Sequence, residues 1–367
     1  MSLRTFKEGQ VEISASSGEI TKKLPVFYNP LMAFDRDLSV AVLKAHGGQD
    51  LSYCDVLAGS GIRGMRALKE SGVVSDLFLN DLSPEAVKLI GGNLEKNKLR
   101  AQVSNKDVNL LLREHRCDKF DVVDIDPFGT FITSLDSALR AVKRRKGLLF
   151  LTATDSAPLC GTSIKSCLRK YDARSLRASY CKEIGLRILM GAAARMAARY
   201  EMALKPVFSY NRRHYFRLFL EVSSGIKRAD DAVSKLAYVQ HCFKCEFRTY
   251  VRIPGFLEEC PNCGARLDWA GPMWSGEIAN ASLCDRILNE NENKEIRELV
   301  ERVEDDTKID LPFYDIHRLS EVNKTISPKR DFLIEKIKES GYDTVRTHFS
   351  KTGFRTEAPI ATIVENL

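Results

Sequence analysis

The sequence predicts an α/β fold in which a doubly wound, mostly parallel sheet is followed by a smaller α+β domain. Three observations support this prediction. Short apolar, β-branched runs alternate with helical segments between residues 53 and 154, which is the pattern of parallel strands joined by crossover helices. A glycine-rich turn follows the first of these runs. Two C-x-x-C pairs lie beyond the alternating region, at residues 242–263.

Size and composition indicate a water-soluble protein of more than one domain. The chain has 367 residues, 44% hydrophobic and 29% charged, which is typical of globular proteins. No apolar run approaches the ~20 residues that a membrane helix needs. The first ten residues lack the apolar core of a signal peptide. We therefore expect a cytoplasmic protein with no membrane partner, and a monomer is favoured.

The charge is unevenly distributed along the chain. The net charge is +7 overall, but residues 140–217 alone carry 18 basic and 4 acidic side chains. Five tyrosines are interleaved with these basic residues. Such a local excess is typical of a surface that binds phosphates, although a solvated helical face is the alternative.

The elements before the glycine turn include one candidate ligand. V-E-I-S at residues 11–14 predicts a strand, the Pro-flanked segment 24–30 predicts an extended arm, and residues 31–45 have helical periodicity. Arg36 lies in that helix between Asp35 and Asp37. Without further information, a surface salt bridge is the simplest role for Arg36.

A nucleotide-binding pattern begins at residue 53. The strand Y-C-D-V-L-A is followed by Gly59-Ser60-Gly61-Ile62-Arg63-Gly64 and a helix. Glycines allow the backbone to turn tightly and approach a ligand, and a helix N-terminus presents free N–H groups. The next strand ends at Asp81, about where such units place the acceptor for ribose hydroxyls.

Two further strand ends carry acidic residues. The third strand leads to Asp107-Val108, where a carboxylate and a backbone N–H could bind an adenine ring. The fourth strand ends in D-I-D-P-F-G, residues 124–129. Asp126 and the carbonyl of Pro127 can accept hydrogen bonds, and Phe128 can stack on a planar ring. An ordinary strand and turn is the alternative for this motif alone.

A helix near 130–143 and a strand at 147–154 complete five parallel strands. Residues 158–203 are expected to be mainly helical, and two strands around an Arg-rich turn close the first domain, which we place at residues 1–225. The second domain is placed at residues 226–367, with an acidic helical segment at 284–306.

Four cysteines give the most specific single motif. Cys242 and Cys245 are separated by fourteen residues from Cys260 and Cys263. Two such pairs can complete a tetrahedral zinc site with no open position. The spacing predicts a structural zinc ribbon at about residues 240–268.

Several motifs together resemble one family. They are F-Y-N-P-x-M-A-x-x-R-D, S-G-I-R, N-D-x-S-P-E-A, D-I-D-P-F-G, T-D-x-A-x-L-C-G, the cysteine pairs and T-H-x-S-x-T-G-x-x-T, in this order between about residues 25 and 359. The chain is similar to the tRNA (guanine-26, N2) dimethyltransferases, especially the archaeal members. The resemblance implies a Rossmann-like class I methyltransferase domain with S-adenosylmethionine as cofactor and tRNA as partner.

The resemblance also implies roles for individual residues. Asp126 would orient and deprotonate the guanine amine, with Phe27 and Phe128 on either side of the base. The cofactor would be held by the glycine turn at Gly59 and Gly61 and by the following side chains and backbone: Arg36, Arg63, Asp81, Asp107 and Val108.

Two alternative functions stay open from the residues alone: a nicotinamide-dependent dehydrogenase and a catalytically silent tRNA-binding protein. The acidic strand ends favour methyl transfer to nitrogen, since hydride transfer needs no carboxylate that orients an amine. The residues also leave open whether one or two methyl groups are added, whether a neighbouring guanosine is modified, which tRNAs are recognised, and the roles of Asp124 and Ser60.

Overall fold

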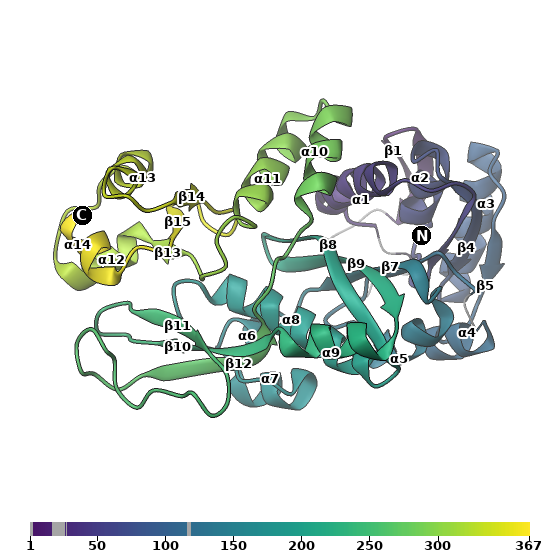
Figure 1. The fold of residues 1–367 in the computed structure, drawn as a ribbon. Coiled ribbons are helices and arrows are strands. Elements are labelled where there is room, and N and C mark those ends of the chain that lie inside the picture. The colour runs from purple at the N-terminus through teal and green to yellow at the C-terminus, as the bar shows by residue number, and fades with distance from the viewer. Residues whose placement is uncertain (1–2, 17–25, 27, 116–118) are drawn as a thin grey trace. The chain divides into compact units, whose positions relative to one another are not determined.

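The chain folds into two compact units in a computed structural model that describes residues 3–16, 26, 28–115 and 119–367 (Figure 1). The first unit comprises Met1–Ala153, Leu218–Gly225 and Asp285–Arg297, and the second comprises Thr154–Arg217, Ile226–Cys284 and Glu298–Leu367. The expected division into domains at residues 1–225 and 226–367 stays a prediction. None of the described helices is both long and apolar enough to cross a membrane.

The largest sheet confirms the predicted doubly wound topology. Its strand order is β5-β4-β3-β6-β7-β9-β8, and β3 pairs in parallel with both β4 and β6. Strand order reverses between β3 and β6, which is where doubly wound sheets bind ligands at their carboxyl ends. The alternating elements that build this part are β3 (Leu51–Asp55), α2 (Ile62–Glu70), β4 (Val74–Asn80), α3 (Pro84–Asn97), β5 (Gln102–Ser104), α4 (Val108–Glu114), β6 (Val122–Ile125), α5 (Ile132–Ala141) and β7 (Arg145–Ala153).

Local sequence explains where these elements begin. The four residues of β6 are all buried, as expected for a central parallel strand covered on both faces. Helix α3 begins as predicted: the Ser83 side chain caps it by accepting from the Ala86 N–H, and Pro84 occupies the first turn. The expected helix at 31–45 is a 3₁₀ turn, η1 (Pro30–Met32), followed by α1 (Ala33–His46).

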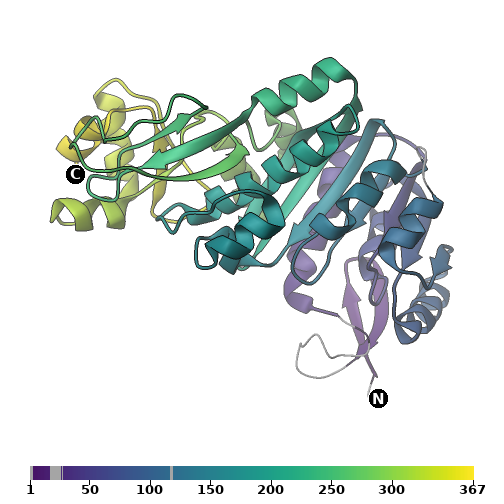
Figure 2. The same cartoon turned by 90° about the horizontal axis from the view of Figure 1, so that it is seen from below.

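An N-terminal hairpin packs on the helices of the first unit. It consists of β1 (Leu3–Glu8) and β2 (Val11–Ser16), drawn in purple in Figure 2. Asn93 of α3 exchanges two hydrogen bonds with the backbone of Ser14, at 2.7 and 3.1 Å. Asn97 does the same with Glu12. These side-chain amides satisfy backbone groups at the edge of β2 in the way a further strand would.

The second unit contains helices and two small sheets. One sheet has the order β11-β10-β12 and carries the cysteine pairs, and the other has the order β13-β15-β14 near the C-terminus. The expected helical region at 158–203 forms three separate helices. The remaining elements of the chain are α6 (Ser156–Leu159), α7 (Ile164–Tyr171), α8 (Cys181–Ala198), β8 (Met202–Arg212), β9 (Tyr215–Ser224), α9 (Ile226–Ser234), β10 (Leu236–His241), β11 (Arg248–Val251), β12 (Asp268–Trp274), α10 (Ala281–Glu290), α11 (Lys294–Asp305), β13 (Tyr314–Asp315), α12 (Ile316–Asn323), α13 (Arg330–Glu339), β14 (Thr344–Arg346), β15 (Gly353–Thr356) and α14 (Ile360–Glu365).

Candidate functional site

The glycine turn forms a tight loop between β3 and α2. Gly61 is the N-cap of α2 and has a φ of +80°, in the left-handed region that favours glycine. A Cβ atom added there would lie 2.9 Å from the Met65 Cε. Gly64 has no room for a side chain either, because its Cβ would lie 2.5 Å from the Leu79 Cδ2. These glycines bring the backbone and the N-terminus of α2 close to the sheet.

Asp81 closes this loop from the end of β4. The backbone N–H of Gly59 donates to its Oδ2 at 2.8 Å, and the N–H of Ser83 donates to its Oδ1 at 2.9 Å. Each carboxylate oxygen can accept a second hydrogen bond. The structure therefore places Asp81 directly beside the glycine turn, as an acceptor for ligand hydroxyls would have to be.

Asp107 and Val108 lie at the start of α4, at the same edge of the sheet. The Asp107 Oδ1 caps the helix by accepting from the N–H groups of Asn109 and Leu110, at 2.9 and 3.2 Å. Asp107 is exposed and Val108 is buried. The cap fixes the direction of the carboxylate, with its Oδ1 bound to the helix.

Arg63 is the centre of a cluster of carboxylates. Its Nη1 donates to the Asp35 Oδ2 at 2.7 Å, and its Nη2 donates to the Asp126 Oδ2. The Asp124 Oδ2 lies 4.0 Å from Nη1. Burial alone would lower the pKa of Arg63, but Asp126, Asp35 and Asp124 outweigh burial and raise that pKa well above its ordinary value. The guanidinium therefore stays charged.

Asp126 is the member of this cluster that reaches solvent. It follows the last residue of β6, Ile125, and its side chain is 25% exposed, whereas the side chains of Asp35 and Asp124 are fully buried. Phe128 is 50% exposed two residues further on. A partly exposed carboxylate, a proline carbonyl and an accessible ring thus lie together after β6. Phe27, the other ring of the expected sandwich, lies outside the described residues.

Asp124 has a partner of its own. The Tyr53 hydroxyl donates to its Oδ2 at 2.5 Å, and Tyr53 is completely buried. This contact gives Asp124 an internal, supporting position in the cluster.

Asp55 adds an unexpected carboxylate to the cluster. It lies opposite Asp124 in the β3–β6 register and is 1% exposed. Its Oδ2 has no hydrogen-bond partner among the residues that the structure describes. Burial, followed by the neighbouring Asp124 carboxylate, raises the pKa of Asp55 to about 7, and Arg63 acts in the opposite direction. The sequence did offer a signal, since Asp55 is an acidic residue four positions before the first glycine of the turn.

Arg36 does not form a surface salt bridge with its neighbours, and that interpretation is wrong. It is buried and forms a two-pronged ion pair with Glu8, with Nε–Oε1 and Nη2–Oε2 distances of 2.6 and 2.5 Å. Arg66 and the Tyr28 hydroxyl bind the same carboxylate at 2.8 and 3.0 Å. A cofactor role of Arg36 stays a prediction.

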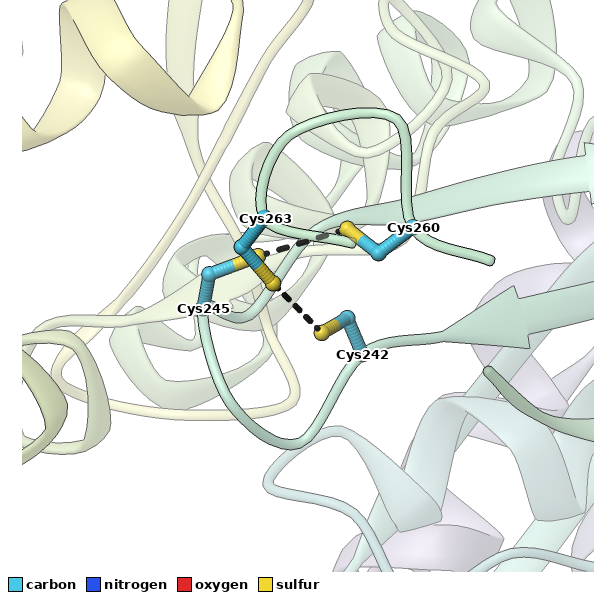
Figure 3. A group of neighbouring side chains, drawn as sticks. All are labelled: Cys242, Cys245, Cys260 and Cys263. Atoms are coloured by element: carbon cyan, nitrogen blue, oxygen red, sulfur yellow. Dashed lines mark hydrogen bonds between the residues drawn. The ribbon is translucent and has the colours of Figure 1, made fainter. Parts of the chain in front are cut away.

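The four cysteines converge at the ends of two similar turns (Figure 3). Their sulfur atoms all lie within 4.8 Å of one another. In each turn the first cysteine accepts from the N–H of the fifth residue at 2.8 Å, and that fifth residue has a positive φ: +64° for Glu246 and +69° for Gly264. Two matching turns that direct four thiols to one point fit a tetrahedral metal site.

Three other polar positions have structural roles. His241 and Arg248, which flank the first cysteine pair, are buried. Arg355 of the C-terminal T-H-x-S-x-T-G-x-x-T motif is also buried, 2.8 Å from Glu183 and in contact with Asp306. The Arg355 side chain is therefore not available to a partner.

Comparisons with known proteins agree over the whole chain. A family model described as N2,N2-dimethylguanosine tRNA methyltransferase matches residues 6–367. A Methanothermobacter thermautotrophicus protein named tRNA (guanine(26)-N(2))-dimethyltransferase is 40% identical over 377 aligned positions, which cover 99% of this chain and 98% of the relative. A protein of the same name from Methanocaldococcus jannaschii is 39% identical and covers 98% of this chain, with 97% of its own length matched.

A solved structure is similar along its full length. The structure of Trm1 from Pyrococcus horikoshii in complex with S-adenosyl-L-methionine superposes with a TM-score of 0.87 at 32% sequence identity. The match covers 99% of both chains.

Proposed function

Because the chain belongs to the N2,N2-dimethylguanosine tRNA methyltransferase family, we propose that Asp126 is the residue that orients and deprotonates the reacting amine. The family that the motifs resemble is confirmed. The two alternatives, a nicotinamide-dependent dehydrogenase and a catalytically silent tRNA-binding protein, are no longer supported. The protein transfers methyl groups from S-adenosylmethionine to the exocyclic N2 amine of guanosine 26 in tRNA. The observation that carries the residue assignment is the position of Asp126: it is a partly exposed carboxylate after β6, beside the reversal of strand order.

The chemistry of the amine explains why a carboxylate is needed. The N2 lone pair is delocalised into the guanine ring, so the amine is a poor nucleophile. Asp126 and the Pro127 carbonyl can each accept an N–H hydrogen bond, which aligns the amine and localises its lone pair. As the new N–C bond forms, the methyl group's bond to the cofactor's sulfur would break and leave its electron pair on sulfur, and a proton passes from N2 to Asp126. A monomethylated N2 still carries one N–H, so Asp126 can act a second time.

The glycine turn and its neighbours fit the cofactor. Gly61 and Gly64 let the turn and the start of α2 pack closely on the sheet, and Asp81 offers carboxylate oxygens next to Gly59. S-adenosylmethionine supplies an electrophilic methyl group on a sulfonium. We assign its ribose hydroxyls to Asp81 and its adenine to Asp107 and Val108. Arg36 and Arg63 keep the cofactor-binding roles that the family resemblance implies.

Methyl transfer by Asp126 variants tests this assignment. Asp126→Ala should bind S-adenosylmethionine with the affinity of the unaltered protein in calorimetry, yet transfer almost no labelled methyl to unmodified tRNA. Asp136→Asn removes an exposed carboxylate on the following helix and is the matched control. Near-normal turnover by Asp126→Ala would show that the wrong residue has been assigned, while the control should keep full activity.

The four cysteines are proposed to bind one structural zinc ion. Thiolate ligands at all four tetrahedral positions leave no place for substrate, so the metal would stabilise the ribbon rather than take part in catalysis. The support is the convergence of the four sulfur atoms within 4.8 Å.

The exposed basic side chains of α7 and the segment after it are proposed to contact tRNA phosphates. Lys165, Arg169 and Arg177 are exposed. Arg144 and Arg145 belong to the same basic stretch, residues 140–217, but lie where β7 begins. Because β6 and β7 are parallel, this is the opposite edge of the sheet from Asp126. Arg144 and Arg145 therefore serve as the control.

Salt dependence distinguishes the two sets. Replacing Lys165, Arg169 and Arg177 with alanine should weaken tRNA binding. The fall of log K with log salt should become less steep, by about 0.7–0.9 in slope for each phosphate that the variant no longer neutralises. Replacing Arg144 and Arg145 should leave that slope within experimental error. The assignment fails if only the replacement of Arg144 and Arg145 changes the slope.

A monomeric state and a cytoplasmic location stay predictions. Light scattering tests the first and cell fractionation tests the second.

A further inference from the structure

We propose that Asp35 is a positioning residue for methyl transfer, acting on Asp126 through Arg63. Asp35 lies in α1, far along the chain from the β6 end, at an unspecified position of F-Y-N-P-x-M-A-x-x-R-D. The inference rests on the proposed role of Asp126. It adds a requirement: the Asp126 carboxylate must be held in one orientation by the buried side chains of Arg63 and Asp35.

A continuous line of contacts connects the two carboxylates. Asp35 is 0% exposed, and its Oδ2 accepts from the Arg63 Nη1 at 2.7 Å. The other terminal nitrogen of the same planar guanidinium, Nη2, donates to the Asp126 Oδ2. Since both nitrogens belong to one rigid plane, fixing Nη1 also fixes the direction of Nη2. Asp126 is thus held by its Oδ2, which leaves Oδ1 to accept from the substrate.

The neighbouring groups explain why Arg63 turns toward Asp126. Asp124 is the competing partner, with its Oδ2 4.0 Å from Nη1. Tyr53 donates to that same oxygen at 2.5 Å, so Asp124 already has a hydrogen bond. The Ser39 hydroxyl lies 3.4 Å from Nη1 and supports Arg63 from the same helix as Asp35. Without Asp35, Nη1 loses the contact that fixes the guanidinium plane, so Nη2 no longer holds Asp126 in one direction.

The chain offers a matched control two residues away. Asp37 is also an acidic residue of α1 that pairs with an arginine of α2, since its Oδ1 lies 2.6 Å from the Arg66 Nη2. Arg66 is held in addition by Glu8 and Glu70, at 2.8 and 2.7 Å. Asp37 and Arg66 therefore form a second pair between the same two helices, in a separate cluster from the one that holds Asp126.

The experiment compares Asp35→Asn with Asp37→Asn in the full-length protein. We measure the dissociation constant for S-adenosylmethionine by calorimetry, and kcat and KM for tRNA at saturating cofactor. Asp35→Asn should lower kcat at least tenfold while both the cofactor affinity and the KM for tRNA stay within threefold. Asp37→Asn should leave all three within twofold. A purely structural role of Asp35 would lower melting temperature and active fraction without this separation of kcat from binding.

Arg63→Lys provides the second variant. Lysine keeps the buried positive charge, but a single ammonium cannot hold Asp35 and Asp126 in one plane. Its kcat should fall as far as that of Asp35→Asn, and the double variant should fall no further, because both changes break the same line of contacts. If Asp35→Asn does not fold, Arg63→Lys carries the test alone.

Two results would overturn the proposal. One is a kcat within twofold of the unaltered protein for Asp35→Asn or for Arg63→Lys. The other is a loss of cofactor affinity with an unchanged kcat at saturation for Asp35→Asn, which would assign Asp35 to cofactor binding instead. An active Asp126→Ala would instead refute the proposed function itself. An inactive Asp126→Ala beside a normal Asp35→Asn removes only the positioning role.

Discussion

Asp55 gives the sharpest prediction about stability, because its environment sets both the sign and the size of the effect. The change is Asp55→Asn, which keeps the shape of the side chain and removes its ionisation. In the folded protein, burial and then Asp124 raise the pKa of Asp55 to about 7, from an ordinary value of 3.8. The folded state therefore holds a proton that the unfolded state releases.

The sign follows from this difference. Below about pH 4 the Asp55 carboxyl is protonated in both states and has no effect on the pH dependence. Between about pH 4 and 7 the unfolded state ionises first, so the free energy of unfolding falls as the pH rises. Above pH 7 the loss is complete. One pKa unit corresponds to 1.36 kcal/mol, so the shift of about three units amounts to roughly 4 kcal/mol at most.

The assay is urea unfolding of both proteins at pH 4.5 and pH 8, followed by far-ultraviolet circular dichroism. Both tryptophans, Trp269 and Trp274, belong to the second unit, so their fluorescence would not report on β3. Relative to the unaltered protein, Asp55→Asn should gain stability between pH 4.5 and pH 8 by an amount approaching that figure. Asp76→Asn, a partly exposed position in β4, is the control. An equal difference at both pH values would refute the buried proton.

Two further predictions concern packing and metal. Gly64→Ala should destabilise the protein by about 1–3 kcal/mol, because the added Cβ meets Leu79 Cδ2 at 2.5 Å. Gly91→Ala in helix α3, where an added Cβ has open space around it, should instead stabilise the protein by up to about 1 kcal/mol. Melting temperatures of the two variants check both predictions. Equal effects would contradict the close contact between α2 and β4. Purified protein should contain about one zinc ion per chain by metal analysis. Cys263→Ser should lower both the metal content and the melting temperature. A metal-free protein of full stability would contradict the zinc site.

The elements that sequence predicted well are those with strong local signals. The four apolar residues of β6 and the Ser-Pro start of α3 placed their elements correctly. The segment expected to be acidic and helical, residues 284–306, is helical, but it forms two helices, α10 and α11. Asn293 separates them, because its side chain accepts from the N–H groups of Glu295 and Ile296 at 3.0 and 3.4 Å. An asparagine before a helical run is a recognisable cap, so this break could have been predicted.

By itself the sequence determined the type of fold, the order of the motifs and the candidate for the reacting carboxylate. These properties depend on periodicity, on turns and on residues that are close in the chain. Only the tertiary structure decided which acid pairs with which arginine. Arg36 and Arg63 each bind a carboxylate 28 positions earlier, Glu8 and Asp35 respectively. Those choices depend on how a hairpin and two helices pack, because an ion pair forms wherever packing brings opposite charges together, whatever their separation in the chain.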